Sequence, residues 1–454
     1  MNDSLVGKNS NTVLIGWLFF ISVVLTLLVP SFQAPDEINH FGRALGLADG
    51  QIFAKGGAIE VDSTFTRIFS MQSEFKFQYD FKNTRALQHH LEHLPWTHQT
   101  DLLSLPNTAV YFPLVYVPQA IGVLIAKLFG LLPYATYQAA RLSAIAISFL
   151  LLLWANRIRT IPPLVIMLLG LPMSLFLTTS ASPDGVSFAL TTLAAALFLK
   201  IYHQQSQEGH LKTACLLAAV IFAIITARIN TFPILLLFPF LALYRKLSAK
   251  QAAVVFSATF LSALGWVVYA FKSIAADGGF FVNSGMTTGQ KAVYYLQNPS
   301  RLVKIFADTL SHPDVNHGYW TQFIGVLGWL DTPLVRGYYF IFSALLVVGM
   351  IIYYNKDKRL LVLSIFLLLV INLLTHFILL VSWTNLNDLT IQGVQGRYFI
   401  PIFILVAYLC SDDGAHIFAK NHITAKLKLW LPFAFIFLSG IALVNAVTNR
   451  YLLN

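Results

Sequence analysis

Long apolar runs separated by short basic connections are the feature that most constrains this chain. A membrane-spanning helix needs about 20 predominantly apolar residues. Charged residues make up only 11% of the 454 residues, against about a quarter in globular domains. The sequence therefore predicts an all-α polytopic membrane protein. The apolar runs lie at about 12–31, 109–130, 139–156, 161–180, 185–202, 211–227, 231–244, 251–271, 338–354, 360–382, 397–411 and 427–447.

The distribution of lysine and arginine predicts which runs cross the membrane. If the run at 109–130 does not cross, the basic connections share one side with the amino terminus, and the positive-inside rule makes that side the cytoplasm. If it crosses, all of them face out. We therefore expect about eleven spans, with 109–130 as an interfacial or re-entrant helix. The basic connections carry Arg157, Arg159, Lys200, Lys212, Arg245, Lys246, Lys250, Lys356, Lys358, Arg359, Lys420, Lys426 and Lys428.

This topology predicts three parts of the chain. Residues 1–271 form a membrane module with a large outer loop at 32–138, residues 272–337 form a second outer loop, and residues 338–454 form the C-terminal transmembrane helices. We expect 12–31 to be the first span rather than a cleaved signal peptide. The net charge of +10 is spread over short loops, which indicates anionic lipid rather than nucleic acid as its counterpart.

Two adjacent carboxylates follow the first span, in Ala34-Pro35-Asp36-Glu37. Pro35 ends the helix because it lacks a backbone N–H and disfavours helix for the residue before it. The acids need another explanation, since carboxylates at a membrane boundary are costly unless they are solvated, paired or used. A partly dehydrated carboxylate can act as a general base toward a hydroxyl. We expect Asp36 and Glu37 to be catalytic, with Asp36 favoured as the base; a solvated helix end is the alternative.

A second acid lies at an outer membrane end, in Ser182-Pro183-Asp184-Gly185. This sequence is typical of a tight turn in which Asp184 caps the following helix. The alternative is a carboxylate that also contributes to substrate or metal binding.

Three arginines, Arg141, Arg228 and Arg397, lie at predicted outer ends of spans, where the positive-inside bias disfavours a cation. Arginine suits bidentate binding of phosphate. Each could instead extend toward lipid headgroups, but three together favour an anionic ligand such as phosphate.

The histidines and cysteines give weaker signals. His89 and His93 are four residues apart, as metal ligands on a helix can be, but histidines in a solvated loop are commoner. We therefore predict no certain cofactor, with a divalent metal such as Mg²⁺ or Mn²⁺ as the alternative. Cys215 and Cys410 lie in apolar runs and offer neither a disulfide framework nor a CxxC metal site.

The segment Pro35-Asp36-Glu37-Ile38-Asn39-His40-Phe41-Gly42-Arg43-Ala44 is the most specific motif of the chain. With it, the sequence resembles a family of bacterial predicted membrane proteins of unassigned function that carries a Pro-Asp-Glu-x-x-His-Phe signature after the first span. Weaker matches are Tyr111-Phe112-Pro113-Leu114, Pro118-Gln119, Ala140-Arg141-Leu142, Ser182-Pro183-Asp184 and Gly396-Arg397-Tyr398-Phe399 with Pro401. The candidate substrate-binding residues are His40, Arg43, Tyr111, Gln119, Arg141, Asp184, Arg228, Arg397 and Tyr398.

That layout is similar to the C superfamily of membrane glycosyltransferases (GT-C), the protein O-mannosyltransferase and aminoarabinose transferase kind. The resemblance implies a GT-C-like fold with amphipathic juxtamembrane helices, one of them at 109–130, and a polyprenyl-phosphate or polyprenyl-diphosphate sugar donor. It places Asp36 or Glu37 at the catalytic acid position and Asp184 at the second outer acid. The segment 111–119 lacks the basic residue often found before the paired prolines in those transferases, so Arg141, Arg228 or Arg397 would have to contact the donor phosphate.

The resulting hypothesis is an inverting glycosyltransferase of the bacterial inner (plasma) membrane with its active site on the periplasmic or extracellular side. It would move a sugar from a polyprenyl-phosphate-linked donor to a surface polysaccharide or glycoconjugate. Its partners would be that donor, a glycan acceptor and membrane lipid, with no nucleic acid. The alternatives are a polysaccharide polymerase or ligase, a transporter or flippase of a lipid-linked glycan intermediate, and a non-catalytic scaffold.

Overall fold

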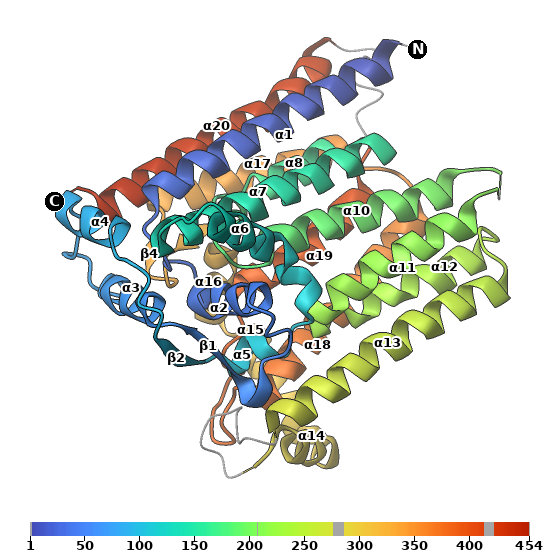
Figure 1. The fold of residues 1–454 in the computed structure, drawn as a ribbon. Coiled ribbons are helices and arrows are strands. Elements are labelled where there is room, and N and C mark those ends of the chain that lie inside the picture. The colour runs from blue at the N-terminus through green and yellow to red at the C-terminus, as the bar shows by residue number, and fades with distance from the viewer. Residues whose placement is uncertain (1, 207, 276–285, 413–421, 454) are drawn as a thin grey trace.

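The computed structural model describes residues 2–206, 208–275, 286–412 and 422–453, and these are about 74% helical (Figure 1). Lys420 and the 276–285 part of the predicted second outer loop lie outside the described residues. Eight helices of the described chain are long and apolar enough to cross a membrane, which supports the predicted all-α polytopic class. They are α1 (Asn2–Leu28), α7 (Pro133–Ile158), α10 (Asp184–His203), α11 (His210–Ala227), α13 (Ala249–Ala275), α17 (Arg336–Tyr353), α18 (Lys358–Ser382) and α20 (His422–Tyr451).

Three of the predicted spans are built from shorter pieces. The run at 161–180 breaks into two short helices before Pro172, because proline cannot donate the next helical hydrogen bond. The runs at 231–244 and 397–411 each begin as a 3₁₀ helix and continue as a short α-helix. The predicted count of eleven requires these three to cross as well, and it stays a prediction. The pieces are α8 (Pro163–Leu169), α9 (Pro172–Thr178), η3 (Ile229–Leu236), α12 (Leu237–Leu243), η4 (Gly396–Phe399) and α19 (Ile400–Cys410).

The run at 109–130 also consists of short helices: the end of α5 (Pro106–Ala109), then η2 (Pro113–Tyr116) and α6 (Val117–Leu128). The 12 residues of α6 rise about 18 Å, much less than the roughly 30 Å of a bilayer core. It packs along α7, where a Cβ on Gly122 would lie 2.3 Å from the Ala139 carbonyl oxygen. This geometry fits the predicted interfacial or re-entrant helix.

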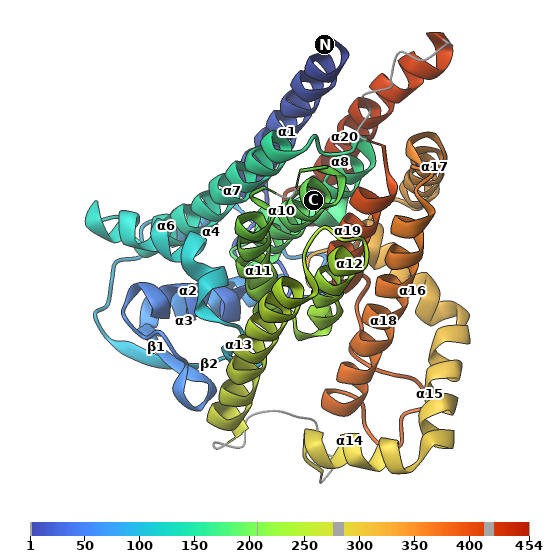
Figure 2. The same cartoon turned by 90° about the vertical axis from the view of Figure 1, so that its right-hand side faces the viewer.

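The connections between helices lie at two ends of the helix bundle, and hydrogen bonds show which of them share an end. At one end, the Lys82 ammonium donates to the Asn449 carbonyl (2.9 Å), and the Lys291 ammonium donates to the Thr384 carbonyl (2.9 Å). We call this the loop end; residues 29–132, 286–335 and 383–395 gather there (Figures 1 and 2).

The opposite end, which we call the basic end, holds the short connections between spans and the start of α1. There the Tyr202 hydroxyl donates to the Asp357 carboxylate (3.0 Å), and the Asn355 N–H donates to the Cys410 carbonyl (2.7 Å). The chain begins at the basic end and finishes at the loop end, which agrees with an odd number of crossings.

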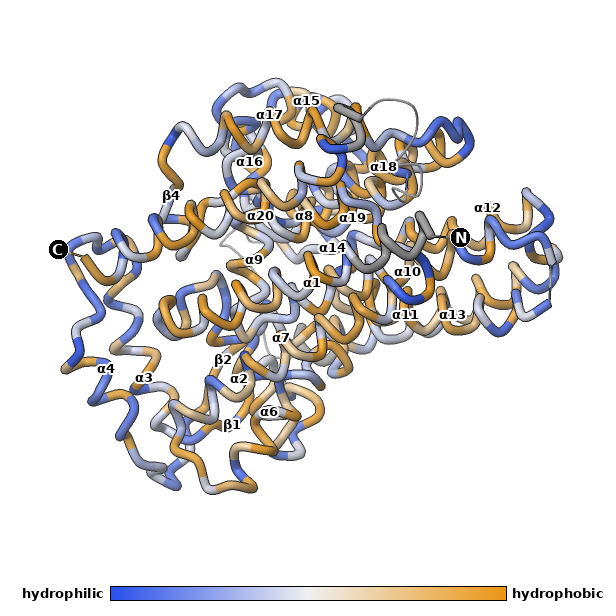
Figure 3. Tube along the Cα trace, turned by 90° about the horizontal axis from the view of Figure 1, so that it is seen from above, coloured by the Kyte–Doolittle hydropathy of each residue, from blue (hydrophilic) through white to orange (hydrophobic). Residues whose placement is uncertain are grey.

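The loop end carries a folded layer that the sequence did not predict in detail. Its amphipathic helix α2 buries Phe41 and Leu45 against Ile59 and Phe65. A two-stranded antiparallel sheet, with Ala58 opposite Ser104, covers α2. Figure 3 shows hydrophilic residues gathered along α3 and α4 and hydrophobic residues dominating the bundle. The elements are α2 (Glu37–Ala48), η1 (Lys55–Gly57), β1 (Ala58–Asp62), α3 (Ser63–Ser73), α4 (Arg85–Glu92), β2 (Thr100–Ser104), α14 (Thr288–Gln297), α15 (Pro299–Ser311), α16 (Pro313–Gly325), β3 (Val326–Leu327) and β4 (Thr332–Pro333).

This arrangement predicts which positions share a side of the membrane. In a chain with Cys215 and Cys410 replaced by alanine, an impermeant maleimide should label the exposed Ser104→Cys and Ser300→Cys from the same side and Ser206→Cys from the other. Labelling in intact and then permeabilised cells measures this. Reaction of Ser104→Cys and Ser300→Cys from different sides would contradict the arrangement.

Candidate functional site

The turn between α1 and α2 determines where the two adjacent acids point. Asp36 occupies the N-cap position of α2 with φ 61° and ψ 10°, in the left-handed region that side-chain-bearing residues rarely adopt. Asp is one of the few residues that tolerate it, because its short polar side chain can hydrogen-bond locally. Such a conformation persists only where the surroundings determine it, and it is commonest at functional sites.

Glu37 points inward and is almost fully buried. Its Oε1 accepts hydrogen bonds from the Tyr137 hydroxyl (2.6 Å) and the Ala181 N–H (2.7 Å), and its Oε2 accepts one from the Ala34 N–H (3.1 Å). Glu37 therefore ties the α1–α2 turn to α7 and to the connection between α9 and α10. This makes it a positioning residue rather than a group open to substrate.

Asp36 is the accessible acid of the pair, with 40% of its side chain exposed. Its Oδ2 lies 3.2 Å from Nη2 of Arg397, and its Oδ1 accepts a hydrogen bond from the Asn107 amide (3.0 Å). The Asn107 side-chain oxygen in turn accepts from the Asn39 side-chain amide (2.7 Å). The sequence could not rank the two acids with certainty, and this geometry favours Asp36 as the one that meets a ligand.

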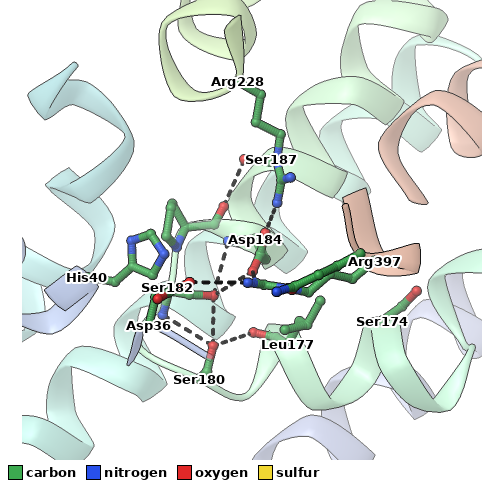
Figure 4. Close-up of polar contacts among 12 residues, drawn as sticks. Asp36, His40, Ser174, Leu177, Ser180, Ser182, Asp184, Ser187, Arg228 and Arg397 are labelled. Atoms are coloured by element: carbon green, nitrogen blue, oxygen red, sulfur yellow. Dashed lines mark hydrogen bonds and ion pairs between the residues drawn. The ribbon is translucent and has the colours of Figure 1, made fainter. Parts of the chain in front are cut away.

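Asp184 completes a cluster of two carboxylates and two guanidinium groups (Figure 4). Its Oδ1 pairs with Arg228, and its Oδ2 lies 3.5 Å from Nη1 of Arg397. The Ser182 hydroxyl donates to the same carboxylate (3.1 Å). The prediction that Asp184 caps the following helix is wrong, because Asp184 is the first residue of α10, the N-cap is Pro183, and the Asp184 side chain is held by the arginines instead. A role of Asp184 in substrate binding stays a prediction. We call Asp36, Asp184, Arg228 and Arg397 the ion-pair cluster. Its formal charges cancel, as burial requires.

Gly396 explains how Arg397 reaches the cluster. A Cβ at this glycine would lie 1.9 Å from the Tyr319 carbonyl oxygen and 2.7 Å from the Phe323 nitrogen, so only glycine lets η4 pack directly on α16. The Gln395 side-chain oxygen accepts from Nε of Arg397 (2.6 Å), which fixes the plane of the guanidinium. The Tyr398 ring packs against the same guanidinium, with 5.2 Å between the ring centroid and Cζ of Arg397.

His40 lies beside Asp36 in Figure 4 and is buried. Its Nδ1 lies 2.9 Å from the Tyr116 hydroxyl, and its ring stacks on Tyr111 at 5.7 Å between centroids. Burial lowers the pKa of His40 to about 3. At neutral pH it is therefore an uncharged hydrogen-bonding partner next to the cluster.

Two predicted binding residues, Arg141 and Gln119, donate hydrogen bonds to backbone carbonyl oxygens instead. Arg141 donates from Nε to the Thr179 carbonyl (2.6 Å), and its Nη1 contacts the carbonyls of Thr26 and Val29 and the side chain of Gln138. The structure therefore leaves Arg141 outside the ion-pair cluster, because the carbonyl groups at two helix ends already satisfy it.

Gln119 donates to the Ser182 carbonyl (2.9 Å) and thereby supports the turn that presents Asp184. Arg43 lies on the same face of α2 as Asp36 and His40, since positions four and seven residues along a helix share a face.

The possible metal ligands of the described residues do not gather in one place. His89 and His93 stack at 4.1 Å on α4 and its C-cap, apart from the cluster. Among the described residues, no group of three or more His, Cys, Asp or Glu could hold a metal ion. Both carboxylates of the ion-pair cluster are already matched by arginine, so we assign no step to a metal.

Several residues that support the site were not predicted from the sequence. Tyr137 carries the shortest hydrogen bond to Glu37, and Asn107 and Gln395 orient Asp36 and Arg397. Tyr116 lies in the aromatic segment 111–119, so the sequence could have identified it. The others lie among ordinary polar or apolar residues, and no sequence pattern distinguishes them.

Comparison with known proteins adds one family. The profile of a family described as "Predicted membrane protein (DUF2142)" matches residues 19–406, a range that includes the whole ion-pair cluster. A search of curated proteins found no match to this chain.

Glu37→Gln should lower the free energy of unfolding by about 1–3 kcal/mol, because an amide offers one acceptor oxygen to donors that the carboxylate serves with two. Thermal unfolding in detergent measures this, with the exposed Glu60→Gln as the matched control. Equal stability of the two variants would contradict the positioning role of Glu37.

His40 should make stability depend on pH. Its folded pKa of about 3 lies below the unfolded value of 6.5, so the unfolded chain binds the extra proton between these values. Stability from this residue is complete above about pH 6.5 and is lost as the pH falls toward 3. Melting temperatures measured from pH 7 to pH 4 should fall less steeply for His40→Gln than for the wild type, and parallel curves would contradict the burial argument.

Proposed function

We propose that this chain, which belongs to the DUF2142 family of predicted membrane proteins, is a membrane glycosyltransferase with a GT-C-like arrangement of about eleven spans. It moves a sugar from a polyprenyl-phosphate-linked donor to a surface polysaccharide or glycoconjugate. The loop end is the periplasmic or extracellular side of a bacterial inner membrane. The observation that carries the proposal is the half-exposed carboxylate of Asp36, held by Arg397 where the helices meet the outer layer.

The proposed step is a direct displacement at the anomeric carbon. Asp36 accepts the proton of the acceptor hydroxyl, and the acceptor oxygen forms a bond to the anomeric carbon. The bond between that carbon and the phosphate oxygen breaks, and the phosphate leaves with the electron pair, which inverts the anomeric configuration. A general base of this kind contributes about 10²–10⁴ in rate.

The placement of buried charge favours chemistry at one face over transport. Glu37, Asp184, Arg397, Asp331 and Arg450 are buried, and all lie at the loop end. Alternating access usually needs broken helices together with ionisable groups near mid-membrane. The three interrupted runs meet the first condition, but these buried acids and arginines do not meet the second, because they lie at the loop end. A polymerase or ligase would use the same bond-forming step, so acceptor and product length separate it from a single-sugar transferase.

The ion-pair cluster leaves one requirement of this reaction unmet. Arg228 and Arg397 are both matched by carboxylates, with Asp184 between them and Asp36 beside Arg397. Their charges hold the two acids in place, and little net positive charge is left for a leaving phosphate. The proposed reaction therefore needs a further cation near Asp36.

Asp36→Asn should remove one defined sugar from the surface glycan of a deletion strain complemented with the variant. An amide cannot take the acceptor proton, so we expect transfer to fall by about 10²–10⁴. Mass spectrometry of the glycan measures this, with the exposed Asp80→Asn as the matched control and with equal amounts of each protein in the membrane.

A wild-type glycan from Asp36→Asn would remove the catalytic role of that residue and with it the proposed mechanism. Loss of the whole polymer rather than one sugar would favour a polymerase or a flippase instead.

A further inference from the structure

Arg43 is a buried cation that is part of neither the ion-pair cluster nor the proposed displacement step. Its side chain is fully buried, yet it makes one hydrogen bond, from Nη2 to the Ile52 carbonyl (3.1 Å). Nε and Nη1 are buried and have no hydrogen-bond partner in the part of the chain that the structure describes. Its guanidinium lies over the Tyr116 ring, 5.8 Å from the centroid.

The three other fully buried arginines of the described chain are better satisfied. Arg141 donates to four oxygen atoms. Arg397 contacts Gln395, Asp36 and Asp184. Arg450 contacts the Gln78 and Phe75 carbonyls and the Asp331 carboxylate, while its Nε has no partner among the described residues. No carboxylate of the described residues lies within ion-pair distance of Arg43.

An unmatched buried cation is costly, because it loses its hydration without gaining a counter-charge. Such a group persists where a partner that is not part of the folded chain supplies the missing acceptors. A guanidinium with free N–H groups on two nitrogens suits an oxyanion such as phosphate.

The position of Arg43 relative to Asp36 matches the proposed reaction. Both lie on one face of α2, with His40 between them and Tyr116 in contact with His40 and Arg43. Seven residues of helix rise about 10 Å. A base, an acceptor oxygen, an anomeric carbon and a leaving phosphate in line span about 9 Å, at roughly 3 Å a step.

The surroundings of Arg43 also offer a route to lipid. The segment that accepts its hydrogen bond exposes Ile52 (50%) and Phe53 (44%). Phe53 contacts Trp266 and Tyr269 of α13, at 5.9 Å and 5.6 Å between ring centroids. Since α13 is long and apolar enough to span a membrane, these ring contacts connect the segment next to Arg43 to a helix that can face lipid.

We propose that Arg43 binds the phosphate of a lipid-linked substrate, whose isoprenoid chain leaves past Phe53, Trp266 and Tyr269 along α13. This inference rests on the proposed function, because it assigns the cation that the leaving phosphate needs. It makes Arg43 a substrate-binding residue whose burial lowers the stability of the ligand-free protein.

The first test is the stability of the protein without ligand. Arg43→Met removes the unmatched charge and keeps most of the side-chain volume, so the unfolding temperature in detergent should rise by about 2 °C or more. The control Arg450→Met removes a matched buried arginine, and the unfolding temperature should fall. A fall with Arg43→Met of the same size as with Arg450→Met would overturn the proposal.

The second test is binding of farnesyl phosphate to the purified full chain in detergent, followed by tryptophan fluorescence. Arg43→Met should weaken binding at least 10-fold, because a charge-assisted contact is lost. Farnesol lacks the phosphate and should bind wild type and variant equally. Unchanged binding of farnesyl phosphate by Arg43→Met would overturn the proposal.

Two further ligands distinguish the source of the phosphate. Inorganic phosphate alone should bind at least 10-fold more weakly than farnesyl phosphate, because it lacks the chain that contacts α13. Phosphatidylglycerol in mixed micelles should not displace farnesyl phosphate at equal concentration. Equal competition by phosphatidylglycerol would overturn the assignment to a substrate and indicate a general lipid-headgroup site.

These measurements separate the two proposals. Neither test requires sugar transfer, and the exposed control Asp80→Asn should bind farnesyl phosphate as the wild type does. A normal glycan from Asp36→Asn together with Arg43-dependent binding would refute the transfer mechanism and leave the phosphate site standing. Loss of a sugar with Asp36→Asn, together with equal binding of farnesyl phosphate by wild type and Arg43→Met, would refute the phosphate site and leave the transfer mechanism standing.

Discussion

The interaction on which the site depends is the position of Arg397 between two carboxylates. Arg397 comes from the C-terminal part of the chain, and it contacts Asp36 after the first span and Asp184 at the start of α10. Arg228 pairs with the other oxygen of Asp184. A buried guanidinium of this kind is tolerated only when its charge is matched and its donors are used. Charge matching thus brings segments more than 300 residues apart into one cluster.

The rest of the outer layer fixes the backbone on which these charges stand. Glu37 fastens the turn that carries Asp36, Gln119 supports the turn that carries Asp184, and Gly396 allows Arg397 to lie close to α16. Asp36 and Arg43 differ from these groups: 40% of the Asp36 side chain is exposed, and Nε and Nη1 of Arg43 have no hydrogen-bond partner among the described residues. Both residues lie on one face of α2. Under the proposed function they are the two that meet substrate, which is where a protein gives up stability for function.

The sequence predicted the class of fold and several members of the site because both depend on local patterns. Charges at the outer ends of spans stand out against an apolar background, so Asp36, Asp184, Arg228 and Arg397 could be identified without knowing that they touch. The basic connections likewise predicted which loops lie at the same end of the bundle. The contacts of Lys82 with Asn449 and of Asn83 with Tyr451 agree with that prediction.

Other features depend on tertiary packing that no local pattern reports. Adjacent acids look equivalent in a sequence, but the left-handed conformation of Asp36 sends the Glu37 side chain into the core. Arg141 resembles the other outer arginines, yet neighbouring helix ends place carbonyl oxygens around it. The strands β1 and β2 are short and far apart in the sequence, so neither can be distinguished from a loop, and three apolar runs break into shorter helices within the bundle.

A double-mutant cycle between Asp184 and Arg397 tests the central claim most directly, with Asp184→Asn, Arg397→Gln and the double variant compared by unfolding in detergent. One coupled cluster predicts an interaction energy of about 1–3 kcal/mol. Effects that add to within about 0.5 kcal/mol would contradict it.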